Sequence, residues 1–304
     1  MSKRNFRETH HRELWSRFGT NRCVPAVHLL HFFSKMKSIR YPAALAASVT
    51  AARIAGDLMC RNLRRTKKVN AASAHDIKLE LDVRCQRQIT RALLSEYPDI
   101  PVLGEEGYDD EAVQNAEFRW VVDPIDGTVN FAHGIPHACV CIALQARTGS
   151  ASGAFETVTG AVLDPFHDEL WTAIVRQPAR LNGRKIQVSR RRKLADAMIA
   201  IGFASSDRTV KQMLPVFNDL FSKVRKLRLM GSAGLALTYV ADGRFDGYLE
   251  AGIRLWDIAA GGLIVECAGG RFGREVIDAD HRYAINVNNG LLNGPLAAVL
   301  KAHE

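Results

Sequence analysis

The sequence predicts a layered mixed α/β fold. Three observations lead to this class. Apolar residues at helical spacing alternate along the chain with short apolar runs typical of strands, and no internal repeat interrupts the alternation. The 304 residues are 47% hydrophobic and 24% charged, which is ordinary globular usage. A chain of this length forms one large domain or two modest ones, with a substantial buried core.

The first predicted elements are two helices and a strand. Residues 42–65 are rich in alanine and place apolar side chains at helical spacing, so they predict a helix. Residues 66–75 are small and polar and predict a loop. The pattern over 76–94 predicts a second helix, which Tyr97-Pro98 ends. Residues 102–103 predict a short buried strand that leads into Gly-Glu-Glu-Gly at 104–107.

Strands and helices alternate over the remainder of the chain. Asn182-Gly183 between two short apolar runs is a strong hairpin signal. Helices are predicted at 209–221, 234–242 and 256–268. Strands are predicted at 118–122, 138–145, 160–163, 170–175, 197–201 and 245–250, and near 272 and 283–286.

Small residues cluster near 147–155 and predict a soft boundary there. The sequence thus divides into an extension of residues 1–40, a half of residues 41–150 and a half of residues 151–304. The extension is interpreted as an addition to a domain that begins near 36–41, and Met36 is an alternative start. Its arginines and histidines also fit an organelle transit peptide, although Glu8 and Glu13 speak against one.

The formal net charge of +9 is concentrated at the N-terminus. Residues 1–40 hold nine basic and two acidic side chains, so this segment carries +7 and the rest of the chain only +2. A body so close to neutral lacks the broad basic surface expected of a nucleic-acid-binding domain. The short basic runs at 61–68, 190–193 and 223–228 are interpreted as solvated faces.

The cysteines and the apolar runs indicate a reducing compartment. The six cysteines form no C-x-x-C pair and no zinc-ligand spacing. Cys139 and Cys141 share one face of a predicted strand and are interpreted as free buried thiols of a cytoplasmic protein. No uninterrupted apolar run reaches the length of a membrane span or of a secretion signal, so no membrane partner is expected.

Acidic residues recur where predicted strands end or helices begin. They are Glu105 with Glu106, Asp123 with Asp126, and Asp257. In α/β folds ligands bind at the rim of the sheet, where these carboxylates are expected to converge. Converging carboxylates need a cation among them. These motifs contain no lysine or arginine, which favours a hard divalent cation, Mg²⁺ above all.

The segment Asp123-Pro124-Ile125-Asp126-Gly127-Thr128 indicates the chemistry. The proline fixes a turn that lets the two aspartates face one point, and Gly127 permits a tight turn or a close approach to a ligand. Thr128 is expected to open a helix, and a helix N-terminus attracts anions. Carboxylates, Mg²⁺ and an anion site together predict two-metal hydrolysis of a phosphate ester.

Each motif also has a purely structural interpretation. Asp123 and Asp126 are common turn and cap residues, and Asp257 fits the N-terminus of the next helix. Only the joint pattern favours a metal site. His133 and His137 are interpreted as loop residues because Mg²⁺ prefers oxygen, and the aspartates at 164 and 168 as hairpin residues. The segment 231–234 lacks the spacing of a nucleotide-binding fingerprint.

Three segments together resemble the signature blocks of the inositol monophosphatase family. They are GEEG at 104–107, WVVDPIDGTVNF at 120–131 and LWDIAAGGLIVECAGG at 255–270. The resemblance runs from about residue 42 to the C-terminus. It implies an α-β-α-β-α sandwich, a homodimer, Mg²⁺ as cofactor, sensitivity to Li⁺ and a small phosphate ester as substrate, with inositol monophosphate first.

The resemblance also implies roles for individual residues. Glu105, Asp123 and the main-chain carbonyl of Ile125 match the ligands of a first metal, and Asp123, Asp126 and Asp257 those of a second. Thr128 would orient and deprotonate the attacking water together with Glu105 and Asp82. The amides of Gly127 and Thr128 would hold the phosphate. The substrate contacts implied in the second half of the chain are Ser232, Ala233, Glu250 and Asp257, with Gly231 nearby.

Two departures and two groups of alternatives accompany the resemblance. Residues 78–81, before Asp82, lack the threonine frequent in the family, and the predicted loop at 66–75 has no clear acidic ligand. Other members of the superfamily act on 3′-phosphoadenosine 5′-phosphate, fructose 1,6-bisphosphate or histidinol phosphate. A different class would be a non-catalytic protein whose basic N-terminal arm binds a polyanion.

Overall fold

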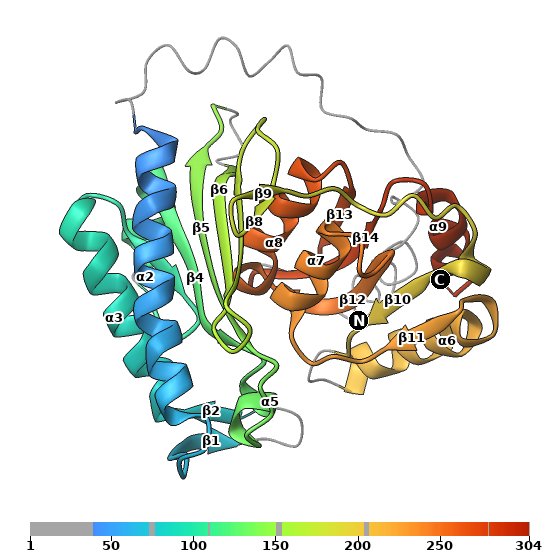
Figure 1. Ribbon diagram of the computed structural model, residues 1–304, viewed down its shortest axis with the longest axis horizontal. Helices are drawn as coiled ribbons and strands as arrows, with labels where there is room; N and C mark the ends of the chain where they lie inside the picture. Colours follow the sequence, from blue (N-terminus) through green and yellow to red (C-terminus); the bar gives the residue numbers. More distant parts are fainter. Residues whose placement is uncertain are drawn as a thin grey trace, which may run out of the picture.

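Five alternating layers of helices and strands make up the structure (Figure 1), a computed structural model that describes residues 39–72, 77–108, 110–149, 154–203, 207–278 and 280–303. The predicted α-β-α-β-α sandwich is confirmed. The predicted extension lies outside the described residues except for its last two positions. The helices of the outer and middle layers are α2 (Tyr41–Asn62), α3 (Glu80–Glu96), α6 (Asp207–Lys223), α7 (Ala233–Ala241), α8 (Leu255–Cys267) and α9 (Asn293–Lys301).

The first sheet has seven strands in the order of the chain, β3 to β9. Only β3 and β4 run parallel, and all later neighbours are antiparallel. Asn182 and Gly183 both have positive φ between the last two strands, as a two-residue hairpin turn requires. The strands are β3 (Val102–Gly104), β4 (Phe118–Asp126), β5 (Cys139–Arg147), β6 (Phe155–Asp164), β7 (Glu169–Ile174), β8 (Arg180–Leu181) and β9 (Arg184–Lys185).

The second sheet has five strands in the order β11-β10-β12-β14-β13. Strand β10 runs parallel to both of its neighbours, while β12, β14 and β13 are antiparallel. Helices α7 and α8 lie between the two sheets, and α6 and α9 cover the outer face of the second (Figure 1). The strands are β10 (Met198–Ile201), β11 (Lys226–Arg228), β12 (Gly247–Arg254), β13 (Arg271–Val276) and β14 (Arg282–Asn288).

Apolar side chains form a separate buried cluster at each helix–sheet junction. The largest surrounds α7 and α8, which are apolar almost all round because both sheets cover them. Helix α2 is long and apolar enough to cross a membrane by length and composition. Its alanine face is nevertheless buried against β5 and β6, which is the packing of a core helix.

The prediction for residues 66–94 was wrong in two places. Strands β1 (Val69–Ala72) and β2 (Ile77–Leu79) pair antiparallel where part of a loop and the first turn of a helix were predicted, while residues 66–68 lack regular structure as expected. Helix α3 therefore begins only at Glu80. Residues 77–79 alternate too briefly to separate a strand from a helix by pattern, and their pairing with β1 decides between them.

Strand β4 continues beyond the point at which it was predicted to stop. Its pairing with β5 shifts register between Asp123 and Asp126 and then resumes. Pro124 lacks an N–H group, so the regular ladder cannot pass through it. The shift separates Asp123 and Asp126 while keeping both at the end of the strand. Helix α5 (Thr128–Ala132) opens where it was predicted, and the elements missed are α4 (Asp110–Asn115), η2 (Leu194–Asp196), β11 and α9.

Candidate active site

A cavity of about 750 Å³ opens where β4, α5, α7, β12 and α8 meet. This is an ordinary size for a small-molecule site. Most residues that the sequence assigned to the site line it. From the first half of the chain these are Glu105, Asp123, Ile125, Asp126, Gly127 and Thr128. From the second half they are Gly231, Ser232, Ala233, Glu250 and Asp257.

The end of β4 holds its acidic side chains in a fixed turn. The amide of Ile125 donates to Asp123 Oδ1 at 3.0 Å, so the turn orients that carboxylate. Gly127 follows with φ of +91°, and a Cβ there would lie 2.9 Å from the carbonyl oxygen of His137. Only glycine fits both conditions. Thr128 then begins α5, and its hydroxyl donates to the Ile125 carbonyl at 2.8 Å.

Asp126 joins the first sheet to helix α7. Its Oδ2 accepts hydrogen bonds from the Ser232 hydroxyl and, at 2.7 Å, from the amide of Gly234, while Oδ1 accepts one from the amide of Ala233 at 3.1 Å. These donors are the first groups of α7, whose N-terminus attracts negative charge. Asp126 is 8% exposed and so keeps only a narrow face toward the cavity.

Asp257 reaches the same cavity from the first turn of α8. Its Oδ2 accepts the amide of Arg254 at 3.0 Å, the hydrogen bond by which an acidic residue at the third helical position caps a helix. The structural interpretation of Asp257 as a cap therefore holds without excluding a ligand role. Asp123, Asp126 and Asp257 each place an oxygen within 4.8 Å of the other two.

Burial and mutual repulsion disfavour the ionised forms of these carboxylates when no cation is bound. The pKa of Asp123 is raised well above its ordinary value, first by burial and then by the charges of Glu105, Asp257 and Asp126. Burial also raises the pKa of Asp126, and burial followed by the Asp126 charge raises the pKa of Asp257 to about 7. A bound cation would favour the ionised forms of all three.

Glu105 is held next to this group by a residue that the sequence did not single out. It follows β3 directly, and its amide donates to the Val122 carbonyl on β4 at 3.2 Å. Gln86 of α3 accepts from the amide of Glu106 at 2.8 Å and donates to the Gly107 carbonyl at 3.0 Å. Gln86 therefore fixes the Gly-Glu-Glu-Gly turn, and no local pattern predicts a contact between residues this far apart in the chain.

Glu250 lies on β12 in the wall of the cavity contributed by the second sheet. The Tyr248 hydroxyl donates to its Oε2, and burial raises the pKa of Glu250 to about 8 despite that bond. Gly202 leaves the space that the Glu250 carboxylate occupies, because a Cβ at 202 would lie 1.8 Å from Oε2. Tyr248 and Gly202 also line the cavity and were not predicted.

Asn130 is a second structural residue that reasoning from the sequence missed. Its side-chain amide donates to the carbonyl of His137 at 2.9 Å and to that of Met230 at 2.8 Å. It thereby ties α5 to the segment that leads into α7. The signal was present, because Asn130 belongs to the conspicuous segment 120–131, but residues 129–131 were used only as an indication of inositol phosphate as substrate, and no structural role was assigned.

Asp82 is the predicted site residue that does not line the described cavity. It lies in the first turn of α3, where its Oδ2 accepts the amide of Leu79 at 2.7 Å. His137 and His133 also lie outside the cavity lining, and Asp164 accepts a hydrogen bond from the amide of Phe166 in the turn between β6 and β7.

Comparisons with known proteins agree with this geometry. The inositol monophosphatase family model matches residues 43–294. Among curated relatives, the Nus factor SuhB of Pseudomonas aeruginosa is 38% identical over 229 residues, which cover 73% of this chain and 82% of that protein. The inositol-1-monophosphatase of Rhizobium meliloti is 39% identical over 204 residues, or 67% and 74% of the two chains.

Solved structures show the same fold. The extragenic suppressor protein suhB of Bartonella henselae has a TM-score of 0.77 at 32% identity and covers 85% of this chain and 98% of its own. The inositol monophosphatase of Anabaena has a TM-score of 0.73 at 30% identity, with 87% and 97% covered. The family match, the layered fold and the carboxylate-lined cavity agree. The chain therefore belongs to the inositol monophosphatase family and is a phosphatase of that superfamily.

Proposed function

We propose that the protein is a Mg²⁺-dependent phosphomonoesterase whose leading substrate is inositol monophosphate. The observation that carries this proposal is the meeting of Glu105, Asp123, Asp126 and Asp257 in one cavity, although they come from three distant segments. The family generally uses Mg²⁺, and the chain supplies a matching set of acidic donors.

The donor set fits Mg²⁺. The groups available are carboxylate oxygens and the Ile125 carbonyl, which are hard ligands of the kind that Mg²⁺ selects. Their raised pKa values mean that the group lacks the positive charge it needs in order to ionise fully. We assign Glu105, Asp123 and the Ile125 carbonyl to one ion, and Asp123, Asp126 and Asp257 to a second. When bound, Mg²⁺ polarises phosphoryl oxygens and lowers the pKa of a coordinated water.

The chain's own groups position the reactants. The Thr128 hydroxyl is fixed on the Ile125 carbonyl, and Thr128 and Glu105 line the same cavity. The hydroxyl would orient the attacking water. The amides of Gly127 and Thr128 would bind the phosphate. Asp82 lies outside the cavity lining, at the start of α3, and is proposed to assist in removing the water's proton.

The second half of the chain is proposed to bind the alcohol part of the substrate. Glu250 presents a carboxylate that accepts hydrogen bonds from substrate hydroxyls, and Ser232, Ala233 and Asp257 lie in the same cavity. A relative named inositol-1-monophosphatase, at 39% identity, supports the choice of a cyclitol phosphate. The alternatives within the superfamily are 3′-phosphoadenosine 5′-phosphate, fructose 1,6-bisphosphate and histidinol phosphate.

A substrate panel with a magnesium titration tests the proposal. We expect release of inorganic phosphate from inositol monophosphate only with Mg²⁺, inhibition by Li⁺, and slower release from the three alternative substrates. A large preference for the nucleotide would overturn the proposed substrate while leaving the phosphatase assignment intact. Failure to hydrolyse any member of the panel would overturn the catalytic proposal.

A second candidate function is non-catalytic. Its basis is the +7 charge of residues 1–40 together with relatives named Nus factor SuhB, a name that describes no phosphatase activity. In this function the basic arm binds a polyanion. Deleting residues 1–40 separates the two: if salt-sensitive polyanion binding disappears while phosphate release continues, the arm is an accessory to an enzyme.

The remaining proposals concern the setting in which the enzyme works. We propose a homodimer, which analytical ultracentrifugation tests directly. We also propose a cytoplasmic location, in keeping with the five described cysteines, all of which are free thiols.

A further inference from the structure

Two buried cysteines lie directly behind the carboxylate group, and the proposed function gives them no role. In the antiparallel pairing of β4 and β5, Cys139 lies opposite Asp126 and Cys141 lies opposite Asp123. Both thiols are 0% exposed, whereas Asp126 also borders the cavity. Asp126 therefore separates the cavity from a pair of sulfur atoms.

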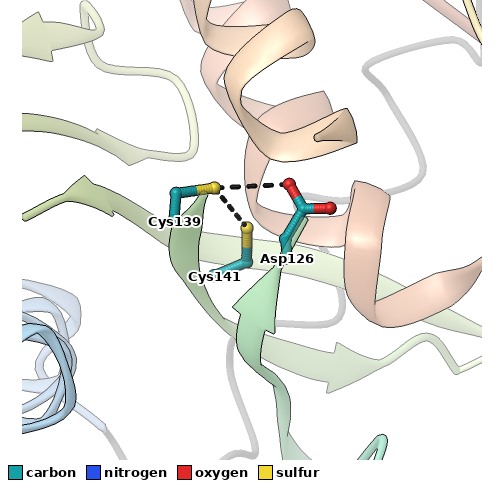
Figure 2. A group of neighbouring side chains, drawn as sticks. All are labelled: Asp126, Cys139 and Cys141. Carbon is teal, nitrogen blue, oxygen red and sulfur yellow. Dashed lines mark hydrogen bonds between the residues drawn. The ribbon is translucent and has the colours of Figure 1, made fainter. Parts of the chain in front are cut away.

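The three side chains converge on a small volume (Figure 2). The sulfurs of Cys139 and Cys141 are 3.7 Å apart, and Cys139 Sγ lies 3.3 Å from Asp126 Oδ2. All three donor atoms lie within 4.8 Å of one another. Two thiolates bound to one tetrahedral Zn²⁺ at about 2.3 Å would be about 3.8 Å apart. The observed sulfur–sulfur distance therefore matches a zinc site.

Gly234, at the start of α7, packs closely against this group. A Cβ built on Gly234 would lie 2.5 Å from Cys141 Sγ, 2.8 Å from Cys139 Sγ and 3.0 Å from Asp126 Oδ2. The start of α7 therefore packs directly on the three donor atoms, and only glycine leaves them in their present positions. Any side chain at position 234 would press on the two thiols and on Asp126.

We propose that Cys139, Cys141 and Asp126 form a binding site for a thiophilic divalent cation, Zn²⁺ in the first instance, distinct from the proposed magnesium site. Thiolate ligands select Zn²⁺ and Cd²⁺ and reject Mg²⁺. Binding replaces the two S–H protons by metal–sulfur bonds and releases both protons to solvent, without any change of oxidation state. The three side chains would supply three of the ligands of the ion.

The site would act on the enzyme through Asp126, which it shares with the proposed magnesium site; this consequence rests on the proposed function. A cation held by the two sulfurs would compete with the proposed magnesium site for the Asp126 carboxylate. It also competes with the hydrogen bonds from Ser232 and Gly234 that hold Asp126 at the start of α7. Zn²⁺ is therefore an inhibitor in this proposal, and excess Mg²⁺ does not displace it from the sulfurs.

Cadmium titration of the full chain tests the site independently of catalysis. With Mg²⁺ in excess, we expect the ultraviolet charge-transfer absorbance of cadmium thiolate to saturate with a tightly bound ion. Cys139→Ser and Cys141→Ser should each weaken Cd²⁺ binding at least about tenfold, since even supporting residues of metal sites have effects of that size. Cys60→Ser and Cys267→Ser are the matched controls, and both should keep the absorbance and the affinity.

Unchanged absorbance and affinity in Cys139→Ser and Cys141→Ser would overturn the proposal, as would loss of the tight site in a control variant. Cadmium NMR of the unaltered chain avoids any folding defect of a variant. A shift typical of two sulfur ligands supports the site, and a shift typical of oxygen ligands alone overturns it. An absent phosphatase activity would refute the proposed function but would leave both cadmium readouts interpretable.

Discussion

Asp123 lies among three other carboxylates and is the acidic residue assigned to both proposed ions. Asp123→Asn should lower kcat at least about 100-fold, because one uncharged ligand weakens both sites. The variant should stay folded. Its melting temperature in a chelator should equal or exceed that of the wild type, because the substitution removes a buried charge repelled by Glu105, Asp257 and Asp126.

Asp168→Asn is the control for that measurement. Asp168 is exposed in the turn between β6 and β7. Its φ is +51°, a backbone conformation that asparagine also adopts readily. Turnover and melting temperature should both stay near wild type. Near-normal turnover of Asp123→Asn would contradict the shared-ligand assignment, whatever the control shows.

Glu250 can be tested through its neighbour without altering the carboxylate itself. Gly202→Ala places a Cβ 1.8 Å from the present position of Glu250 Oε2 and must displace that side chain. We expect KM for inositol monophosphate to rise about tenfold, the cost of a hydrogen bond to a charged group. Gly294→Ala meets no atom within 4 Å and should leave KM unchanged. An unaltered KM in Gly202→Ala would argue against Glu250 as a substrate contact.

At the scale of single residues, the sequence identified the groups whose chemistry is distinctive. Carboxylates at strand ends were recognisable because acidic residues are rare next to buried apolar runs. Gln86, Tyr248 and Gly202 were not, because an amide, a phenol and a glycine are common in every kind of element. Their importance arises from contacts made only after distant segments have packed, as between Gln86 and the turn at 104–107.

Helix α5 depends on one side chain for its position. Asn130→Ala would leave the partly buried carbonyls of His137 and Met230 without the Asn130 donor, and should lower the free energy of unfolding by about 1–2 kcal/mol. Urea denaturation measures this change. Val129→Ala on the same helix, where the side chain is 41% exposed, should change stability by less than about 0.5 kcal/mol. Equal losses of unfolding free energy in the two variants would show that the Asn130 hydrogen bonds contribute little to stability.

At the scale of elements, long apolar segments were predictable, and short ones were predictable where a distinctive motif adjoins them, as Asn182-Gly183 does for β8 and β9. Helices α2, α6 and α8 and the strands of the first sheet follow hydrophobic patterns that few alternatives can satisfy. Strands β1, β2 and β11 are each three or four residues long. Such segments carry too few side chains to define a hydrophobic period. Their structure is decided by the partner strand rather than by their own sequence.

The pH dependence of stability is a property of the whole molecule without metal. Burial raises the folded-state pKa of Asp257 to about 7 and that of Glu250 to about 8, whereas both values are near 4 in an unfolded chain. The folded state therefore binds more protons than the unfolded state between those values. Its stability is greatest below about pH 4 with respect to these two groups and declines as pH rises through 7 and 8.

Thermal melting with and without Mg²⁺ measures this dependence. In a chelator, the melting temperature should decrease as the pH rises from about 5.5 to about 8.5, because the buried Asp257 and Glu250 lose their protons over this range. Mg²⁺ should raise it more at the higher pH, because a cation binds the ionised carboxylates and has to displace protons at the lower pH. An equal magnesium shift at both values would contradict a site built from these acids.

The layered architecture was predictable as a class but not in its strand order. Alternating helices and strands imply layers, and the signature segments imply five of them. The strand order of the second sheet, β11-β10-β12-β14-β13, does not follow the chain, and its β10–β12 pair joins residues as distant as Ile199 and Gly247. Such contacts leave no mark in local hydrophobicity.

The spread of the acidic residues along the chain, from Glu105 to Asp257, has a consequence for biosynthesis. Asp257 is contributed by a helix that packs between both sheets, so it reaches its place only after most of the chain has left the ribosome. A nascent or truncated product that ends before α8 would hold the earlier carboxylates in an open, incomplete pocket. Such a product would lack the second proposed magnesium site, which needs Asp257, whereas the ligands assigned to the first ion all precede α8.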